Sequence, residues 1–424
     1  KRRSPFHRGC WGSQAERAGL GGLGNRGDVG SNNWVVSGDR TSTGRPILAD
    51  DPHRGHAVPS LRYIAHLNAP GINVIGAGEP ALPGISIGHN ERIAFGLTIF
   101  PIDQEDLYVY ERKGNGYLYA GRQEPLQVIE ETIAINGEAS QKAQLRFTRH
   151  GPVVAETKTH VFAVRAAWLE PGMAPYFGSI EYMRAQNFRT FVGALNRWGA
   201  PSENQVYADI DGNIGYKPAG RFPKRDNWDG LLPVPGDGRY EWDGYFDMDV
   251  LPEEYNPERG FSGTANAMSL PEDYPINKYR VGFEWSAPWR YKRLWEVLQN
   301  QDKHSVEDST KLQRDYQSVF AREVISRLPK LATRVPAEGG TMMADWDHNL
   351  GRDSAAAALW NVWYHQHLEP ALMTMLDEEA NSSNSPNLDT LTALKLLQSK
   401  EGKEHAYTTL PKAWLATQQL LGTD

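Results

Sequence analysis

A glycine followed by a serine, Gly30 and Ser31, opens the stretch of this sequence that is best suited to chemistry. The serine starts the strand-like run SNNWVV at residues 31–36. A small residue before such a serine suits cleavage of the chain between the two, which would leave Ser31 at a new amino terminus. A serine hydroxyl needs a base, and a terminal α-amine with a pKa of about 7.7 to 8.0 can act as that base. Taken alone, a Gly-Ser pair is more typical of a turn.

An acidic cluster forms the second candidate site. Asp103, Glu105 and Asp106 lie close together in the sequence, and hard oxygen ligands at such spacing suit calcium, although acidic clusters usually form a solvated loop. The twelve histidines include no helical His-x-x-x-His pair of the kind that indicates catalytic zinc. There is also no Walker or dinucleotide-binding glycine motif. We therefore expect no organic cofactor, and the residues alone leave calcium and a solvated loop both open.

The composition is that of an ordinary globular chain, with 424 residues of which 40% are hydrophobic and 23% charged. A net charge of -7 argues against binding to nucleic acid or to an anionic membrane. Cys10 is the only cysteine, so an intrachain disulfide and a thiolate metal cluster are excluded. No apolar run approaches the roughly 20 residues that span a bilayer, and no signal peptide is visible. Because the chain begins with Lys1, we expect further sequence upstream.

The elements that must position these residues change in type along the chain. Residues 1–30 are basic and glycine-rich, which indicates a linker before the cleavage site. Short apolar runs typical of strands follow at 34–36, 73–75, 85–87, 107–110 and 161–164, and Asp-Gly between alternating runs predicts a hairpin over 206–216. Later residues show helical periodicity, with one helix face over 312–324, a capping pair at Ser305 and Asp308, and a long helix from Ser354 to about Met375. The prediction is an α+β fold, with a nucleophile-bearing β-rich region over 31–300 and a mainly helical region over 301–424.

A series of motifs follows the serine in a definite order. They are PILADDPH at 46–53, PALPG at 80–84, GHN at 88–90, IAFG at 93–96, RHGP at 149–152, YAD at 207–209, GNIG at 212–215, LPVPG at 232–236 and TAN at 264–266. Together they resemble the β subunit of the penicillin acylase family of N-terminal nucleophile hydrolases, over residues 31 to about 360. The resemblance implies a four-layered αββα sandwich, here incomplete, and hydrolysis of a linear amide through an acyl-enzyme on Ser31.

The same resemblance implies roles for further residues. The side-chain amide of Asn266 and the backbone N–H of Ile99 would stabilise the oxyanion, although an isolated asparagine can also simply cap a turn. Many family members have a second asparagine next, where this chain has Ala267. His53 would either relay the proton of Ser31 or pack in the pocket wall, and Arg290 would position the asparagine and the substrate or serve as a structural ion-pair partner.

Specificity, metal and partners also follow from the resemblance. Arg54 and Ile87 stand where relatives line the acyl pocket. Asp103 and Asp106, with an intervening main-chain carbonyl at Glu105, would hold a structural calcium that also takes a ligand from the α subunit. The expected partners are a small-molecule amide substrate and an α subunit cut from the same precursor, in the periplasm or outside the cell. An acyl-homoserine lactone acylase and an inactive fragment that cannot mature are the alternatives.

Overall fold

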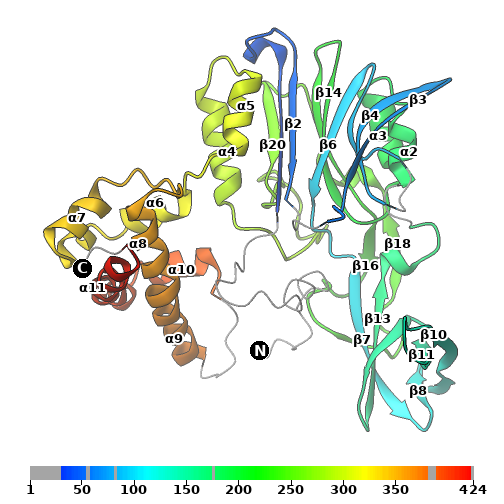
Figure 1. Ribbon diagram of the computed structural model, residues 1–424. Coiled ribbons are helices and arrows are strands. Elements are labelled where there is room, and N and C mark those ends of the chain that lie inside the picture. Colours follow the sequence, from blue (N-terminus) through cyan, green and yellow to red (C-terminus); the bar gives the residue numbers. More distant parts are fainter. Residues whose placement is uncertain (1–29, 54–57, 81–83, 174–176, 381–387, 422–424) are drawn as a thin grey trace. The chain divides into compact units, whose positions relative to one another are not determined.

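The computed structural model describes residues 30–53, 58–80, 84–173, 177–380 and 388–421. The chain forms two compact units that divide between Trp285 and Ser286 (Figure 1). The first unit contains the strands, and the second is helical. Arg54 and most of the predicted linker lie outside the described residues.

Three antiparallel strands carry the predicted nucleophile at one end. In spatial order they are β2 (Ile47–Pro52), β1 (Ser31–Val36) and β20 (Phe261–Thr264). The run at 34–36 is at most 2% exposed, as expected for a central strand that is covered on both faces. Asn33 stands opposite Asp50 on one side and Thr264 on the other. This register places the polar residues of all three strands next to Ser31.

A seven-stranded antiparallel sheet lies against this first sheet. Its order is β19 (Glu254–Tyr255), β15 (Ile214–Ala219), β14 (Glu203–Asp209), β6 (Ile93–Ile99), β5 (Ile87–Asn90), β4 (Ile72–Gly78) and β3 (Tyr63–Ala69). The hairpin predicted over 206–216 is confirmed, since Val206 pairs with Tyr216 and Ala208 with Ile214. The predicted strand at 85–87 is only partly correct, because β5 begins at Ile87 and Ile85 is instead fully buried in the core.

The two sheets and a pair of helices form three layers within the first unit. Val35 of β1 packs with Val206 and Ile214 of the larger sheet, which fixes the sheet-to-sheet contact. A second core contains Phe95 of β6 together with aromatic residues of α2 (Phe177–Tyr182) and α3 (Phe188–Leu195). The order of the layers is therefore helix, large sheet, small sheet, as Figure 1 shows for α2, α3, β6 and β2.

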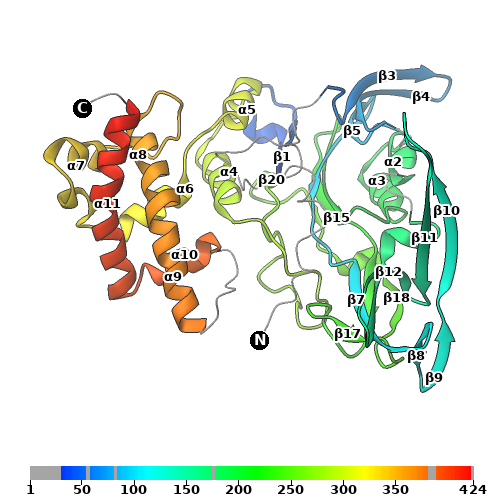
Figure 2. The same cartoon turned by 60° about the horizontal axis from the view of Figure 1, so that its bottom comes forward.

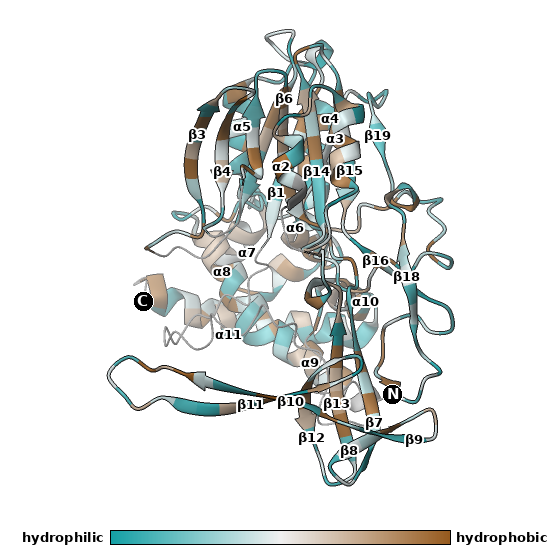
Figure 3. Cartoon of the chain, turned by 90° about the vertical axis from the view of Figure 1, so that its right-hand side faces the viewer, coloured by the Kyte–Doolittle hydropathy of each residue, from teal (hydrophilic) through white to brown (hydrophobic). Residues whose placement is uncertain are grey.

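The first unit also contains an eight-stranded sheet (Figure 3). Its main path is β10 (Gln127–Ile133), β11 (Gln141–Thr148), β12 (Gly151–Glu156), β13 (His160–Ala166), β7 (Glu105–Lys113), β8 (Gly116–Tyr119) and β9 (Arg122–Pro125), with β17 (Val234–Pro235) parallel to β7. The pair β16 (Phe222–Arg225) and β18 (Trp242–Phe246) forms a separate small sheet. The strands predicted at 107–110 and 161–164 are confirmed in β7 and β13. The small hydrophobic core of the eight-stranded sheet includes Tyr108, Tyr110 and Val161.

The second unit contains eight α-helices among its described residues. They are α4 (Trp289–Asn300), α5 (Val306–Gln313), α6 (Val319–Ser326), α7 (Ala337–Ala344), α8 (Ala355–Trp363), α9 (Glu369–Ala380), α10 (Thr390–Leu396) and α11 (Lys400–Leu421). α8 and α11 lie side by side (Figure 2) and share a core rich in tryptophan and leucine. Across the described residues, no helix combines the length and the apolar character that a membrane span requires.

Two helical predictions have different outcomes. The face predicted over 312–324 is not one helix, because α5 ends at Gln313 and α6 starts at Val319. Ser318 interrupts it, since its hydroxyl accepts a hydrogen bond from the Ala321 N–H and so caps a new helix. The capping pair Ser305 and Asp308 is confirmed as a reciprocal capping box. The long helix from Ser354 is confirmed as α8 and α9, joined by a π-helical turn over 364–368.

Candidate active site

The peptide group between Gly30 and Ser31 is held at both of its polar atoms. The Gly30 carbonyl oxygen accepts a hydrogen bond of 2.9 Å from the backbone N–H of His53. The Ser31 N–H donates to the side-chain oxygen of Asn266 over 2.6 Å. Ser31 itself is only 2% exposed. The bond predicted to be cleaved is therefore fixed in place by two residues that are distant from each other in the sequence.

The antiparallel pairing of β1 with β2 explains one of these contacts. Ser31 opens β1 and stands opposite Pro52, the last residue of β2. The residue before β1 and the residue after β2 must therefore lie side by side. This juxtaposition brings the backbone of His53 to Gly30, so the histidine contributes through its main chain at this point.

The tight turn after β20 explains the other contact. Asn266 has a φ of +61°, a left-handed conformation in which asparagine is enriched among non-glycine residues. This conformation directs the amide back toward β1 and β6. Its Nδ2 donates to the Ile99 carbonyl over 3.0 Å, while its Oδ1 accepts from Ser31. Asn266 and Ile99 are thus neighbours as predicted, but they meet through the carbonyl of Ile99, and the N–H role of Ile99 stays a prediction.

A buried chain of hydrogen bonds supports this turn from below. The Thr264 hydroxyl donates to the Asn33 side-chain oxygen over 2.8 Å and lies 2.6 Å from the Thr98 hydroxyl. Asn204 donates to Thr98 over 3.1 Å and to the Ile99 carbonyl over 3.0 Å. The chain ties the end of β20 to β1, β6 and β14. It therefore fixes the start of the turn that carries Asn266.

Asp50 is a buried acid in this layer with an unusual environment. Within the described part of the chain, neither carboxylate oxygen accepts a well-formed hydrogen bond, and the Asn33 Nδ2 opposite it also lacks one. Gly96 makes room for the carboxylate, because a Cβ there would stand 2.6 Å from Asp50 Oδ1. Burial raises the pKa of Asp50 well above its usual range, and the charge of Arg62 opposes this rise only in part. No sequence pattern had predicted that Asp50 would be buried here.

In the described part of the chain, the ring of His53 contacts Asp51 and Asn32, not the hydroxyl of Ser31 to which the predicted proton relay would join it. Its Nε2 lies 3.1 Å from Asp51 Oδ2 and 3.4 Å from Asn32 Nδ2. Among the described residues, no hydrogen bond joins this ring to Ser31. The ring is 41% exposed, so it does not pack into a closed wall either. The proton-relay role of His53 stays a prediction. The contact that His53 makes with the Gly30 carbonyl comes from its backbone N–H.

The remaining predicted residues are Ile87, Arg290 and Arg54. Ile87 is partly buried in β5 and contacts the core between the large sheet and α2 and α3. Arg290 is the second residue of α4 and belongs to the second unit. Arg54 falls in one of the gaps of the described chain. The roles predicted for these residues therefore stay predictions: pocket lining for Ile87 and Arg54, and positioning of the asparagine and the substrate for Arg290.

The acidic cluster that was predicted to bind calcium is surrounded by hydrogen-bond donors of the protein itself. Asp106 is buried and accepts hydrogen bonds from the Arg225 guanidinium and from two tryptophan side chains. Glu105 alternates to the exposed side of β7. Burial raises the pKa of Asp103 to about 7, while Arg225 opposes the rise. In the described ranges, no group of three histidine, cysteine, aspartate or glutamate side chains is arranged to hold a metal.

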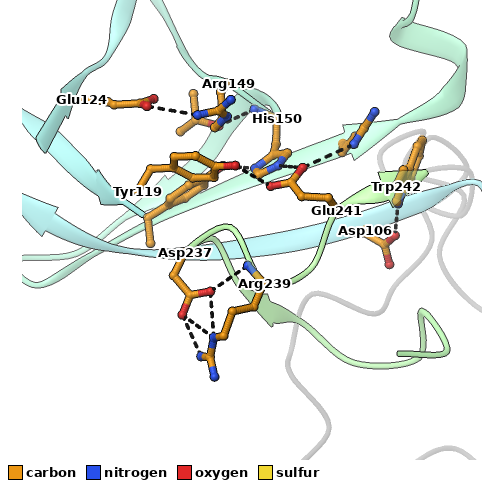
Figure 4. A network of polar contacts seen from close by, with 12 residues as sticks. Asp106, Tyr119, Glu124, Arg149, His150, Asp237, Arg239, Glu241 and Trp242 are labelled. Carbon is orange, nitrogen blue, oxygen red and sulfur yellow. Dashed lines mark hydrogen bonds and ion pairs between the residues drawn. The ribbon is translucent and has the colours of Figure 1, made fainter. Parts of the chain in front are cut away.

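The histidine of the RHGP motif belongs to a separate polar network (Figure 4). His150 Nε2 lies 2.8 Å from Glu241 Oε2, its Nδ1 shares a hydrogen bond with the Tyr110 hydroxyl, and its ring stacks on Tyr108 with centroids 3.8 Å apart. Because a carboxylate can only accept, Nε2 carries the hydrogen and Nδ1 accepts. Burial lowers the pKa of His150, and Glu241 opposes this shift. This network joins β7 to the turn before β12.

The layers and the position of the serine define an N-terminal nucleophile hydrolase fold. The penicillin amidase family model matches residues 5–420, so this chain belongs to that family. The fold is also that of a thermostable penicillin G acylase from Alcaligenes faecalis, with a TM-score of 0.78 and 24% identity over 93% of this chain and 79% of that one. The predicted α+β class and N-terminal nucleophile hydrolase fold are confirmed, and the first unit supplies three layers, αββ, of the predicted αββα sandwich.

Two curated relatives are similar in sequence. Acyl-homoserine lactone acylase QuiP of Pseudomonas fluorescens (strain Pf0-1) is 30% identical over 391 residues, which cover 85% of this chain and 46% of that protein. Penicillin acylase 2 proenzyme of Pseudomonas sp. (strain SE83) is 30% identical over 344 residues, covering 79% of this chain and 44% of the proenzyme. The chain thus spans less than half the length of these relatives.

Proposed function

We propose that this chain is the nucleophile-bearing part of a self-processing amidohydrolase that frees Ser31 and then hydrolyses a linear amide. The observation that carries the proposal is the peptide group between Gly30 and Ser31, with its oxygen held by the His53 N–H and its N–H held by Asn266. Two remote residues therefore hold the carbonyl and the amide of the same peptide group. A bond about to be cleaved benefits from groups that bind both of its ends.

The first step would be attack of the Ser31 hydroxyl oxygen on the Gly30 carbonyl carbon. The C–N bond breaks, the hydroxyl proton passes to the departing Ser31 nitrogen, and an ester forms on the Ser31 oxygen. Water then hydrolyses this ester to a Gly30 carboxylate and a free Ser31. The His53 N–H, at 2.9 Å from the carbonyl oxygen, lies within the range expected of an oxyanion donor.

The freed α-amine would supply the base for turnover. Asn266 Oδ1 already accepts the N–H of Ser31, and the same contact would orient the amine. The neutral amine takes the hydroxyl proton as Ser31 attacks the substrate carbonyl, and it passes this proton to the leaving nitrogen as the C–N bond breaks. The amine product departs, and water then hydrolyses the acyl-enzyme. The amide nitrogen of Asn266 has two hydrogens, of which one is directed at Ile99. The asparagine thus serves the nucleophile with its oxygen and the oxyanion with its nitrogen.

The substrate class follows from the relatives rather than from a pocket. Penicillin acylase 2 and acyl-homoserine lactone acylase QuiP are equally similar to this chain, at 30% identity. Both names describe removal of an acyl group from an amine. We infer an N-acyl amide substrate of the penicillin type, with an N-acyl-homoserine lactone as the second candidate. An α subunit from the same precursor and export to the periplasm remain expectations from the family.

Mass spectrometry of the full-length precursor tests the proposal. We expect a mature chain that begins at Ser31, and a Ser31→Ala variant that stays uncleaved. Ser37→Ala is the matched control, since Ser37 also borders β1 but lies at its far end. Assays with a phenylacetyl anilide and with an N-acyl-homoserine lactone then separate the two substrate classes. An active chain without cleavage before Ser31 would contradict the mechanism, and a cleaved chain inactive on both amides would contradict the substrate class.

A further inference from the structure

Asp106 lies at the centre of a closed set of hydrogen-bond donors. Its side chain is 1% exposed. Oδ2 accepts from Arg225 Nε over 2.7 Å and from Trp242 Nε1 over 2.5 Å, a contact drawn in Figure 4, and Oδ1 accepts from Trp228 Nε1 over 3.3 Å. Both oxygens are therefore satisfied by N–H groups of the protein itself.

Arg225 also reaches the second acid of the pair. Its Nη2 atom lies 3.5 Å from Asp103 Oδ2 and donates to the Asp103 backbone carbonyl over 3.1 Å. The Arg225 side chain is only 4% exposed. Gly230, at a φ of +88°, closes over the group so tightly that a Cβ would stand 2.4 Å from Asp103 Oδ2 and 2.8 Å from Arg225 Cζ. The guanidinium thus sits within contact of both carboxylates in a closed space.

A divalent cation would have to displace these contacts. Calcium takes six to eight oxygen ligands at about 2.3 to 2.6 Å. Here, two indole N–H groups and a permanently charged guanidinium point at the Asp106 oxygens that calcium would need. Asp103 Oδ2 is buried without a hydrogen bond from any described residue, and the cation beside it is the Arg225 guanidinium at 3.5 Å. A calcium ion bound to both carboxylates would lie close to the Arg225 guanidinium, and the two positive charges would repel each other.

We infer that Arg225 is the built-in cation of the Asp103 and Asp106 pair, and that this chain takes no divalent metal there. The guanidinium performs the charge neutralisation that the family resemblance assigns to calcium. It links β16 to the start of β7 by an ion pair within one chain. The inference concerns stability and metal binding, and it does not depend on the chemistry proposed for Ser31.

Terbium luminescence provides a direct test on the full-length protein. Tb³⁺ takes calcium sites, and Trp228 and Trp242 would sensitise its emission because both contact Asp106. We expect no saturable, calcium-displaceable emission from the native protein under tryptophan excitation. We also expect the same melting temperature with calcium and with chelator. Saturable emission at one ion per chain, together with a chelator-sensitive melting temperature, would overturn the inference.

The variant Arg225→Met removes the charge but keeps much of the side-chain length. Because it leaves two buried carboxylates without their cation, we expect it to melt roughly 5 to 15 °C lower than the native protein. Calcium should recover part of this loss. The control is Arg239→Met, which breaks an exposed pair with Asp237 and should change the melting temperature little. An unchanged melting temperature for Arg225→Met would refute the assignment. If this variant does not fold, the terbium measurement on the native protein still decides.

Discussion

The side-chain oxygen of Asn266 lies 2.6 Å from the backbone nitrogen of Ser31, across 235 positions of sequence. The family resemblance led us to expect this asparagine as a donor to the oxyanion, with a simple turn cap as the alternative. Its contact with the bond before Ser31 gives it a place in maturation as well. The two functions use different atoms of one amide, so they can be separated by substitution.

Asn266→Ala should slow both cleavage before Ser31 and turnover of the mature enzyme. The loss in kcat is expected at about 10² to 10³, the usual effect of removing one oxyanion donor. Asn266→Asp retains an acceptor for the Ser31 N–H but lacks the amide donor, so it should mature faster than the alanine variant while its turnover stays low. Mass spectrometry and steady-state kinetics measure the two effects. Equal processing rates in all three proteins would show that the contact with Ser31 has no role in maturation.

His53→Ala is expected to leave self-cleavage within about tenfold of the native rate. The variant keeps the backbone N–H that binds the Gly30 carbonyl, and it loses only a ring that contacts Asp51 and Asn32. The rate of appearance of the chain starting at Ser31 checks this. A precursor that no longer matures would instead assign the proton relay to the imidazole.

Asp50→Asn should stabilise the first unit near neutral pH by about 1 to 3 kcal/mol, because the native carboxyl is buried without well-formed hydrogen bonds. The raised pKa of Asp50 means that its folded form holds a proton that the unfolded form releases. The native chain therefore loses stability as pH rises above the unfolded pKa of about 3.9, until the folded pKa is passed, and the variant should lack this loss. Denaturant unfolding at several pH values measures it. Asp51→Asn, at a hydrogen-bonded and partly exposed position, is the control and should not gain stability.

His150 predicts the opposite pH dependence. Burial lowers the pKa of His150 in the folded chain, so just below the unfolded pKa the unfolded chain binds a proton that the folded chain does not bind. Stability from this residue should fall as pH drops below the unfolded value of about 6.5, and it should be intact above that value. His150→Gln should flatten the curve between about pH 5 and 7, whereas His160→Gln, at an exposed strand position, should not. Thermal unfolding across this range decides, and parallel curves for the native and His150→Gln proteins would remove the histidine from the explanation.

Local sequence patterns predicted most of the strands and helices correctly. They could not predict contacts between residues that are far apart in the sequence. Alternation and Asp-Gly correctly predicted the hairpin from Val206 to Tyr216, because a strand pair with a short turn depends on neighbouring residues. The pairing of Gly30 with His53 follows from the register of two strands, which no motif specifies. Arg225 was missed for the same reason, since it stands more than a hundred residues after Asp106. The acids alone resembled a metal site, and the guanidinium that changes this interpretation comes from another strand.

The hairpin of β10 and β11 gives the chain a region that should open independently of the rest. Every residue of β10 is exposed, and in the described part of the chain it pairs only with β11, whose own first residues are also largely exposed. Few apolar contacts would be lost if the two strands separated, so the free energy of opening should be far below that of the whole unit. Amide hydrogens over 127–145 should therefore exchange with deuterium sooner than those of β1 or β6, and a protease should cut first near residues 134–140.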